Sequence, residues 1–499
     1  MAKNIFQYDC VVIGSGIAGL GFALQASKKF KIAIITKKEL MESNSNYAQG
    51  GIAAVLDRQD SFAKHIQDTL EAGCYLNNKT AVRTMVEQAP QAITWLIELG
   101  AGFNRENTKI ALTKEGGHSA RRIAHAKDAT GKEIERALIF NVRRNKNIDC
   151  FESHIAIDLL VKDGACYGVV ILNDEKKQVE FFKAKSIVLA TGGLGQVYER
   201  NCNPKIATGD GFAIANRVGA RLKHMEFVQF HPTALFKKGQ PAFLLSETLR
   251  GEGAILVDKN GRAFMKKYHP QADLAPRDIV SRAVFEELKK GPVYLDARSL
   301  GAKFIKIRFP YIYDKLWWYG FKMDKDLIPI APAAHYACGG VQTDLNGRTN
   351  IKNLYVVGET AHTGVHGGNR LASNSLLECV VFSRRAAKAV IREKQIRSKT
   401  PAFSWRVFKV IKNNNHQVAK LKRQVRELMW QNVGIVRQEK NIDKTLSDLK
   451  KIERQITKIF NQGVNRGIIE LRNLVQTALL ITQSAKDRKI SACAHYLKK

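Results

Sequence analysis

The sequence predicts an α/β protein in which a doubly wound domain is interrupted by an inserted α+β domain and followed by a helical bundle. Three observations predict this fold. A glycine turn joins an apolar strand to a helix near the N-terminus, two distant apolar strands also end in glycine turns, and apolar residues take helical spacing after residue 399. The chain has 499 residues, which is too long for one ordinary core.

The N-terminal segment has the pattern of a βαβ unit. Residues 8–13 are apolar and β-branched, which predicts a buried parallel strand. A helix is expected over 20–29 and a second buried strand over 31–36. Such a unit is the start of a doubly wound, Rossmann-like sheet.

Helical spacing continues over 61–99, with breaks at Ala72-Gly73 and at Pro90. Further along, residues 186–190 and 354–357 form two apolar strands that end in glycine turns, and we expect both to return to the first sheet. The segment between them would then be an inserted domain. The predicted boundaries are 1–225 with 340–398 for the first domain, 226–339 for the inserted capping domain and 399–499 for the helical domain.

In the predicted helical domain, apolar residues recur three and four positions apart, which indicates an antiparallel bundle. They include Val418, Leu421, Val425, Leu428, Ile452, Ile456, Ile459, Leu471, Leu474, Val475, Ala478 and Leu479. We expect Gly463 and Gly467 to lie at a turn between two of these helices.

Composition restricts the class of protein. The net charge of +34 can attract nucleic acid, anionic membranes or small anions, but no aromatic-interleaved patch or nucleic-acid motif accompanies it. We therefore expect no nucleic acid and no membrane as partner.

None of the eight cysteines forms a C-x-x-C pair, which argues against a metal site, an iron–sulfur cluster and a disulfide framework. Scattered buried thiols and the lack of a secretion signal or long apolar run favour a soluble cytoplasmic protein.

The N-terminal glycine turn fits the pattern G-x-G-x-x-G, with glycines at Gly14, Gly16 and Gly19. The first permits a tight turn, the second lets the backbone approach a pyrophosphate, and the third lets the helix pack on the strand. The helix N-terminus then faces the phosphates. Because the motif follows a clear strand and opens a clear helix, it predicts a dinucleotide site.

The second strand does not decide between FAD and NAD. An acid for the ribose hydroxyls is usual at its end, but Thr36 and Lys37 stand there and Glu39 is the nearest acid. The two later glycine-ended strands favour FAD, which spans more of a sheet than one motif covers. The run 45–51 is rich in glycine and small residues, so its backbone donors suit a flavin ring.

Polar clusters in or beside the inserted segment together suit a small dicarboxylate. They cover 229–233, 246–253, 276–278, 334–340 and 368–376. An arginine fork binds both oxygens of a carboxylate, and histidine donates or changes charge near neutral pH. Two arginines and two histidines beside a flavin would hold a four-carbon diacid with its C–H bond at the ring.

With these motifs in place, the chain resembles the succinate dehydrogenase/fumarate reductase flavoprotein family, and within it the L-aspartate oxidases. The resemblance covers almost the whole length. It rests on the runs GSGIAG, YAQGGIAAV, EGGHSARRIAHAKDATG, ATGG, GDG, QFHPTAL, LRGEGA, APRDIV, PAAHYACGGV, GNRLASNSLLE and GIVR, in this order.

The resemblance implies FAD-dependent oxidation of L-aspartate to iminoaspartate, with O2 (giving H2O2) or fumarate as electron acceptor. Iminoaspartate then feeds quinolinate and de novo NAD biosynthesis, so a quinolinate synthase is a candidate transient partner. The implied catalytic residues are Arg277 as proton donor or acceptor, Glu115 facing the substrate amino group, and His231 and His335 on the carboxylates. The implied substrate-binding residues are Arg370, Gln229, Thr233 and Glu247.

The implied FAD contacts fall in the glycine turn, the 44–51 loop and the later strand ends. They are Gly14, Ser15, Gly16, Ile17, Ala18, Gly19, Lys37, Asn44, Ser45, Asn46, Tyr47, Ala48, Gln49, Gly50, Gly51, Asp210, Glu359, Ser375 and Leu376. A carboxylate such as Glu359 suits the ribityl hydroxyls because it accepts several hydrogen bonds.

Two positions separate this chain from the respiratory members of the family, which are the alternative function. Those members tether FAD to a histidine where this chain has Asn44, so the flavin should be non-covalent. They also carry an aromatic residue where this chain has Glu115, a carboxylate suited to an ammonium group. A third hypothesis is a basic nucleic-acid-binding protein with a vestigial nucleotide fold.

The chain departs from the family pattern in two places. The family's H-Y-T-C-G-G contains Ala337 here, and its C-terminal S-R-G-H-[FY] signature is replaced by Ser491-Ala492-Cys493-Ala494-His495-Tyr496. The tail lacks an arginine and is shortened, which concerns its packing or a partner contact.

Overall fold

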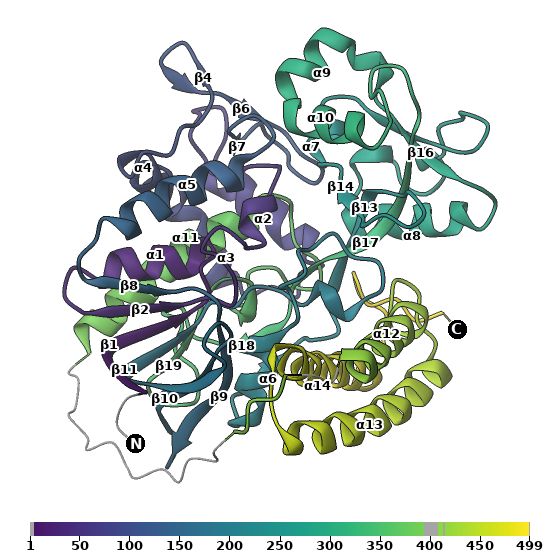
Figure 1. Ribbon diagram of the computed structural model, residues 1–499. Coiled ribbons are helices and arrows are strands. Elements are labelled where there is room, and N and C mark those ends of the chain that lie inside the picture. The colour runs from purple at the N-terminus through teal and green to yellow at the C-terminus, as the bar shows by residue number, and fades with distance from the viewer. Residues whose placement is uncertain (1–3, 394–407, 413–414, 499) are drawn as a thin grey trace.

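The computed structural model describes residues 4–393, 408–412 and 415–498. Its centre is a seven-stranded sheet in the order β8-β2-β1-β11-β10-β9, with β19 paired to β11 (Figure 1). The strands are β1 (Ile5–Ile13), β2 (Ile32–Ile35), β8 (Ile148–Phe151), β9 (His154–Lys162), β10 (Ala165–Asn173), β11 (Gln178–Leu189) and β19 (Leu354–Val356).

Parallel pairing in this sheet confirms the predicted α/β class. Strand β1 is parallel to both β2 and β11, and β19 is parallel to the last residues of β11. The strand predicted at 354–357 therefore does return to the first sheet. The first half of β11 instead pairs antiparallel with β10. The long strand β11 therefore belongs to both the parallel and the antiparallel part of the sheet.

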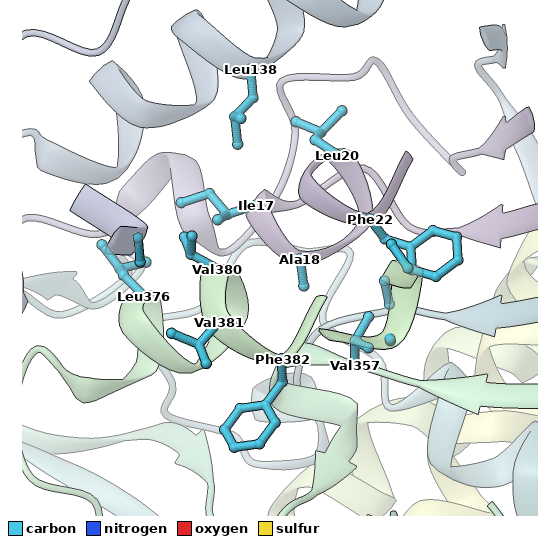
Figure 2. Close-up of a cluster of buried hydrophobic side chains, with 14 of the residues drawn as sticks. Ile17, Ala18, Leu20, Phe22, Leu138, Val357, Leu376, Val380, Val381 and Phe382 are labelled. Carbon is cyan, nitrogen blue, oxygen red and sulfur yellow. The ribbon is translucent and has the colours of Figure 1, made fainter. Parts of the chain in front are cut away.

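Both faces of the sheet are covered. Val12 packs into the cluster that holds α1 (Ile17–Ala26), α5 (Thr130–Arg143) and α11 (Asn374–Arg392). Its neighbours Val11 and Ile13 point the other way, toward α6 (Asp210–Arg217), because successive side chains of a strand alternate. Figure 2 shows the first interface, with Ile17, Leu20 and Val380 among the side chains between α1, α5 and α11.

The turn between β1 and α1 requires glycine. Gly14 has φ +115°, and a Cβ there would lie 2.0 Å from the carbonyl oxygen of Ala190. A Cβ on Gly19 would lie 2.0 Å from the carbonyl oxygen of Gly14. Any side chain at these positions would separate α1 from the strand ends, so the N-terminus of the helix stays at the edge of the sheet.

The predicted helical stretch 61–99 forms three helices, α2 (Phe62–Ala72), α3 (Lys79–Glu87) and α4 (Ala89–Glu98). Short strands complete this part of the molecule: β3 (Ile52–Ala53), β4 (Arg105–Glu106), β5 (Lys109–Ile110), β6 (Leu112–Thr113) and β7 (Ile123–Ala124).

The inserted segment forms its own five-stranded sheet in the order β14-β13-β17-β16-β15 and lies at one end of the molecule (Figure 1). Its elements are β13 (Val228–Leu235), β14 (Phe243–Leu244), α7 (Thr248–Gly251), β15 (Ile255–Val257), α8 (Arg277–Leu288), β16 (Val293–Asp296), α9 (Ala302–Arg308), α10 (Pro310–Trp318) and β17 (Ile328–Ala337).

The chain enters and leaves the insert through two paired strands, β12 (Leu222–Lys223) and β18 (Gly340–Gln342), and β18 also pairs with β20 (Ala361–His362). The predicted boundaries at 225/226 and 339/340 stay predictions, and the boundary at 398/399 lies outside the described residues.

The C-terminal region is helical, as predicted, with α12 (Asn415–Asn432), α13 (Glu439–Gln462) and α14 (Arg466–Asp487) packed beside α6 (Figure 1). Gly463 ends α13 and lies at the predicted turn, whereas Gly467 lies inside α14. Within the described ranges, no helix is long and apolar enough to cross a membrane.

The prediction of scattered, unpaired thiols was wrong for two of the eight cysteines. Cys74 and Cys493 form a disulfide although 419 positions separate them. The C-terminal tail folds back onto the loop after α2, where Ala494 N donates to Gly368 O (3.3 Å) and Gly368 N donates to Gly73 O (3.0 Å). Cys150 is free but exposed, so the remaining thiols are not all buried.

Candidate active site

One cavity connects the carboxyl ends of β1, β2, β11 and β19 with the inserted domain. It is lined by the glycine turn, the 42–51 loop, Glu115, His231, His335, Glu359 and Arg370. Of the residues predicted for the site, Gly19, Asn46, Gln229 and Thr233 do not line it. Gly19 packs α1 on the strand, while Gln229 and Thr233 lie behind the lining side chains and bond to them or to backbone.

The glycine turn forms the inner end of the cavity. Gly16 is the N-cap residue of α1, and Ser15 Oγ donates to Thr36 Oγ1 at 3.0 Å. The adjacent wall carries Lys37, whose Nζ lies 2.6 Å from Asp210 Oδ2 and 3.3 Å from Glu470 Oε1. Burial acts to lower the pKa of Lys37, but the two carboxylates outweigh it and raise the pKa, so the lysine is charged.

Further along, the cavity wall carries oxygen acceptors, two of which lack a donor within the described ranges. Asn44 Nδ2 donates to Glu359 Oε2 at 3.1 Å, and Ala337 N donates to Glu359 Oε1 at 3.0 Å. Burial raises the pKa of Glu359 to about 7. Asn44 Oδ1 and Gln49 Oε1 are buried and have no hydrogen-bond partner among the described residues.

Orphaned acceptors beside a glycine turn at a helix N-terminus fit a hydroxyl-rich dinucleotide. Buried acceptors without donors cost free energy, and the hydroxyls and ring N–H of FAD are donors. The residues present therefore fit FAD: the turn at Gly14–Gly16 would hold the pyrophosphate, and Asn44, Gln49 and Glu359 the polyol and ring.

Adjacent strands of the inserted domain carry the two predicted histidines. His231 lies on β13 and His335 on β17, with ring centroids 5.1 Å apart. Burial and the charge of nearby Arg277 lower the pKa of His231 well below its usual value. Burial, together with the charges of Arg370 and Arg277, also lowers the pKa of His335 well below its usual value. Both imidazole rings are therefore neutral at pH 7.

The inserted domain also contributes a chain of buried, charged side chains. Arg277, the first residue of α8, places Nε 2.5 Å from Glu247 Oε2 and donates from Nη1 to Gln229 Oε1 at 3.0 Å. Glu247 Oε1 lies 3.4 Å from Arg250 Nη2 on the other side. Burial acts to raise the pKa of Glu247, but Arg277 and Arg250 reverse this and hold it below its usual value.

Glu115 occupies a tight polar pocket between the two domains. Thr248 Oγ1 donates to its Oε1 at 2.8 Å, and Ser373 Oγ donates to its Oε2 at 2.5 Å. Two glycines leave room for the carboxylates of Glu115 and Glu247. A Cβ on Gly50 would lie 2.7 Å from Glu115 Oε1, and one on Gly116 would lie 2.3 Å from Glu247 Oε1.

Arg370 completes the site from the loop before α11. Its guanidinium lies over the Tyr336 ring, 4.4 Å from the centroid, and Nη1 donates to Ser375 Oγ at 3.1 Å. Burial and Arg277 lower the pKa of Arg370, but an arginine remains a cation. Gln229 Nε2 donates to the carbonyl of Arg370 at 2.7 Å and so links Arg370 to Arg277.

The site thus combines three arginines with two glutamates and two neutral histidines. The arginines make this set complementary to a small anion, and Glu115 adds an acidic group beside them. Four residues of this site were not predicted individually, although each lies within one of the polar clusters of the sequence: Arg250, Thr248, Tyr336 and Ser373. Nothing in the sequence shows that Thr248 and Ser373 meet at Glu115.

A dinucleotide site at the end of a parallel sheet, opposite an anion site on a capping domain, defines a flavin-dependent oxidoreductase. A model of the FAD binding domain matches residues 9–376, and one of the fumarate reductase flavoprotein C-terminal region matches 422–498. The chain therefore belongs to the fumarate reductase/succinate dehydrogenase flavoprotein family and carries its FAD-binding domain.

Similar proteins of known name indicate which members of the family this chain resembles. The chain is 42% identical to an L-aspartate oxidase of Pseudomonas aeruginosa, over 98% of this chain and 95% of that protein. It is 44% identical to L-aspartate oxidase 1 of Ralstonia nicotianae, with the same coverage. Among solved structures, a variant of E. coli quinol fumarate reductase FrdA has a TM-score of 0.91 at 32% identity, covering 100% of this chain and 92% of that one.

Proposed function

We propose that this protein is an FAD-dependent L-aspartate oxidase that converts L-aspartate to iminoaspartate for de novo NAD biosynthesis through quinolinate. One observation carries the choice of substrate: the buried carboxylate of Glu115 lies in a cavity whose other walls hold Arg277 and Arg370. Aspartate has two carboxylates and one ammonium group, so this set of charges complements it. The L-aspartate oxidase relatives support the same assignment.

The substrate carboxylates lie on the arginines and histidines in this proposal. The planar Arg370 guanidinium is fixed by Tyr336 and Ser375 and retains Nε without a partner among the described residues. It grips one carboxylate, while the neutral rings of His231 and His335 donate to the other. Gln229, Thr233 and Glu247 keep these side chains in position. Bound FAD would accept the hydride equivalent from Cα.

Glu115 faces the substrate amino group. Loss of hydride from Cα requires the nitrogen lone pair, so the ammonium group must give up a proton. A carboxylate held by Thr248 and Ser373 has a fixed orientation and balances the ammonium charge. Succinate has no amino group and gains nothing from such a residue.

Arg277 moves a proton at the substrate carbon when fumarate is the acceptor. Its Nε is paired with Glu247, and Glu247 is also close to Arg250, so a proton lost from Arg277 can be replaced through buried neighbours. In aspartate oxidation, the same cation orients a carboxylate.

The cofactor is held without a covalent bond in this proposal, because Asn44 stands at the tethering position and donates to Glu359. Either O2 or fumarate accepts the electrons. A transient contact with a quinolinate synthase and a cytoplasmic location remain parts of the proposal.

An anaerobic titration tests the proposal. The flavin spectrum of the purified protein is recorded, the protein is precipitated with acid, and flavin should appear in the supernatant. A second sample is mixed with L-aspartate without oxygen, and the oxidised flavin band should bleach. Flavin that stays in the pellet, or bleaching by succinate and not by aspartate, contradicts the proposal.

The second candidate function is that of a fumarate reductase or succinate dehydrogenase flavoprotein, which the TM-score of 0.91 favours. Two residues argue against this second function. A covalent flavin needs a nucleophile where this chain has Asn44, and succinate needs no carboxylate where this chain has Glu115. The same titration separates the two.

A further inference from the structure

A second, larger cleft lies next to the active-site cavity and shares part of its wall. Its volume is about 1310 Å³, and it is bordered by the glycine-turn domain, the inserted domain and α12. Both hollows share Tyr47, Gln49, Cys202, Asn203 and Leu244 in their walls. A small solute in this outer cleft is therefore at the entrance to the substrate site.

The outer cleft is strongly basic. Nine lysine and arginine side chains line it, against four glutamates. One of these glutamates, Glu470, already pairs with Lys37 and Arg466, at 3.3 Å and 3.1 Å. A hollow with low-dielectric walls and an excess of one charge focuses the field and concentrates ions of the opposite charge.

Arg200 in this cleft forms no ion pair within the described ranges, although the adjacent carboxylate of Glu199 acts on its charge. It is half-buried between two aromatic side chains, with its guanidinium 4.2 Å from the Phe236 centroid and 5.6 Å from the Trp430 centroid. No hydrogen bond or ion pair of this guanidinium involves a described residue. Burial lowers the pKa of Arg200, but the side chain remains charged at neutral pH.

The neighbouring cation, Arg426, differs from Arg200 because its guanidinium donates hydrogen bonds within the protein. Arg426 donates from Nε to the carbonyl of Tyr198 at 3.2 Å and from Nη2 to that of Glu199 at 2.8 Å. Arg426 thus fixes the turn that carries Arg200, and leaves Arg200 available. Stacking on a ring occupies the face of a guanidinium and leaves its N–H edge free to bind a carboxylate with two hydrogen bonds.

The segment that follows Arg200 leads to the substrate site. Cys202 Sγ lies 3.1 Å from His335 Nδ1, and Asn203 Nδ2 donates to the carbonyl of His335 at 3.0 Å. The backbone carbonyl of Arg200 accepts from Ala334 N at 3.0 Å. Arg200 and His335 are therefore on one connected wall.

We propose that the outer cleft is an entry site for dicarboxylates and that Arg200 is its carboxylate ligand, which receives the anion before Arg370 and the histidines do. This inference rests on the proposed function, since it takes the substrate and acceptor of the inner site as the anions. Fumarate carries two net negative charges and aspartate one, so the entry site favours fumarate over aspartate in proportion to charge.

The test uses stopped-flow kinetics of the full-length, FAD-loaded protein. The second-order rate constants are measured for flavin reduction by aspartate and for reoxidation by fumarate, at low and high ionic strength. Arg200→Gln is compared with Arg83→Gln, which removes the same charge from an exposed position on α3 outside both hollows. Arg200→Lys keeps the charge without the fork.

At low ionic strength, Arg200→Gln should lower the fumarate constant about fivefold and the aspartate constant about twofold, with unchanged limiting rates at saturation. Salt should remove most of the difference, Arg200→Lys should restore the salt dependence, and Arg83→Gln should match the unaltered protein. If Arg200→Gln does not fold, Lys237→Gln with Lys238→Gln at exposed positions of the same cleft replaces it.

Equal behaviour of Arg200→Gln and Arg83→Gln overturns the entry site. So does a fall in the limiting rates with unchanged second-order constants, because that result places Arg200 in the chemistry and not in capture. Failure of the proposed function looks different: the unaltered protein would then show no bleaching with aspartate at any ionic strength.

Discussion

Arg277 Nε lies 2.5 Å from Glu247 Oε2, and both side chains are almost completely buried. The pair joins the first turn of α8 to the residue that precedes α7, so two elements of the inserted domain determine where the guanidinium points. Gln229 holds the other side of Arg277. The substrate site therefore depends on a buried network and not on isolated side chains.

Replacing Arg277 by leucine should abolish turnover and leave cofactor binding intact. Loss of a proton-transfer and carboxylate-binding group typically costs about 10²- to 10⁴-fold in kcat. The flavin content per protein should not change, because Arg277 lies on the inserted domain and away from the glycine turn. Steady-state kinetics and the flavin-to-protein absorbance ratio check both points. Arg298→Leu, at an exposed arginine of the same domain, is the control. Loss of flavin with normal turnover per bound flavin would contradict the role of Arg277.

Glu115→Gln should damage aspartate oxidation much more than fumarate reduction. The amide keeps the shape and the contacts with Thr248 and Ser373 but loses the charge that balances an ammonium group. We expect aspartate oxidation to fall about 10- to 100-fold and fumarate reduction to stay within about threefold. Both rates are measured on one preparation, so the fumarate reaction is the internal control. Equal losses would show that Glu115 does not act on the amine.

Local patterns were sufficient to predict the glycine turn and the strands beside it, whereas most lining residues were named only through the family resemblance. Gly14, Gly16 and Gly19 lie within six positions, between an apolar strand pattern and a helical pattern that are both read from neighbouring residues. Contacts between distant segments could not be predicted in this way. Glu115 meets Thr248 and Ser373 at sequence separations of 133 and 258, and the pairing depends on how the inserted domain closes over the sheet.

The antiparallel β10–β11 pair was also not predicted from the sequence. A strand of twelve residues, Gln178–Leu189, contains both the segment that pairs with β10 and the segment that pairs with β19. Apolar runs indicate burial but not the direction of the neighbouring strand. The sequence therefore predicted the class of sheet but not its full strand order.

Glu359 should make the FAD-free protein less stable as pH rises. Burial raises the pKa of Glu359 to about 7 in the folded protein, from a usual value near 4.5. The folded state then holds the proton more tightly than the unfolded state, so stability falls between about pH 4.5 and pH 7 and levels off above it. The full effect is of the order of 3 kcal/mol.

Glu359→Gln removes this titration. We therefore compare the melting temperatures of the FAD-free variant and the unaltered FAD-free protein. The difference, variant minus unaltered protein, should be more positive at pH 8 than at pH 5. Calorimetry at both pH values measures the difference. A constant difference across this range would mean that Glu359 does not titrate as its burial requires. The variant should also bind FAD more weakly, because an amide accepts fewer hydrogen bonds than a carboxylate.

The Cys74–Cys493 disulfide should stabilise the molecule and fix its tail. It closes a loop of 419 residues, and cross-links over long loops typically contribute about 2–4 kcal/mol. Under denaturing conditions without reductant, thiol titration should find six free cysteines, and reduction should reveal the other two. Cys493→Ser should lower the melting temperature without reductant, and reductant should have no further effect on this variant. Cys150→Ser, at an exposed free cysteine, should melt like the unaltered protein. Eight titratable thiols before reduction would show that the bond does not form.

The tail also bonds to Gly368, two residues before Arg370, so the KM for aspartate should rise in Cys493→Ser while kcat changes less.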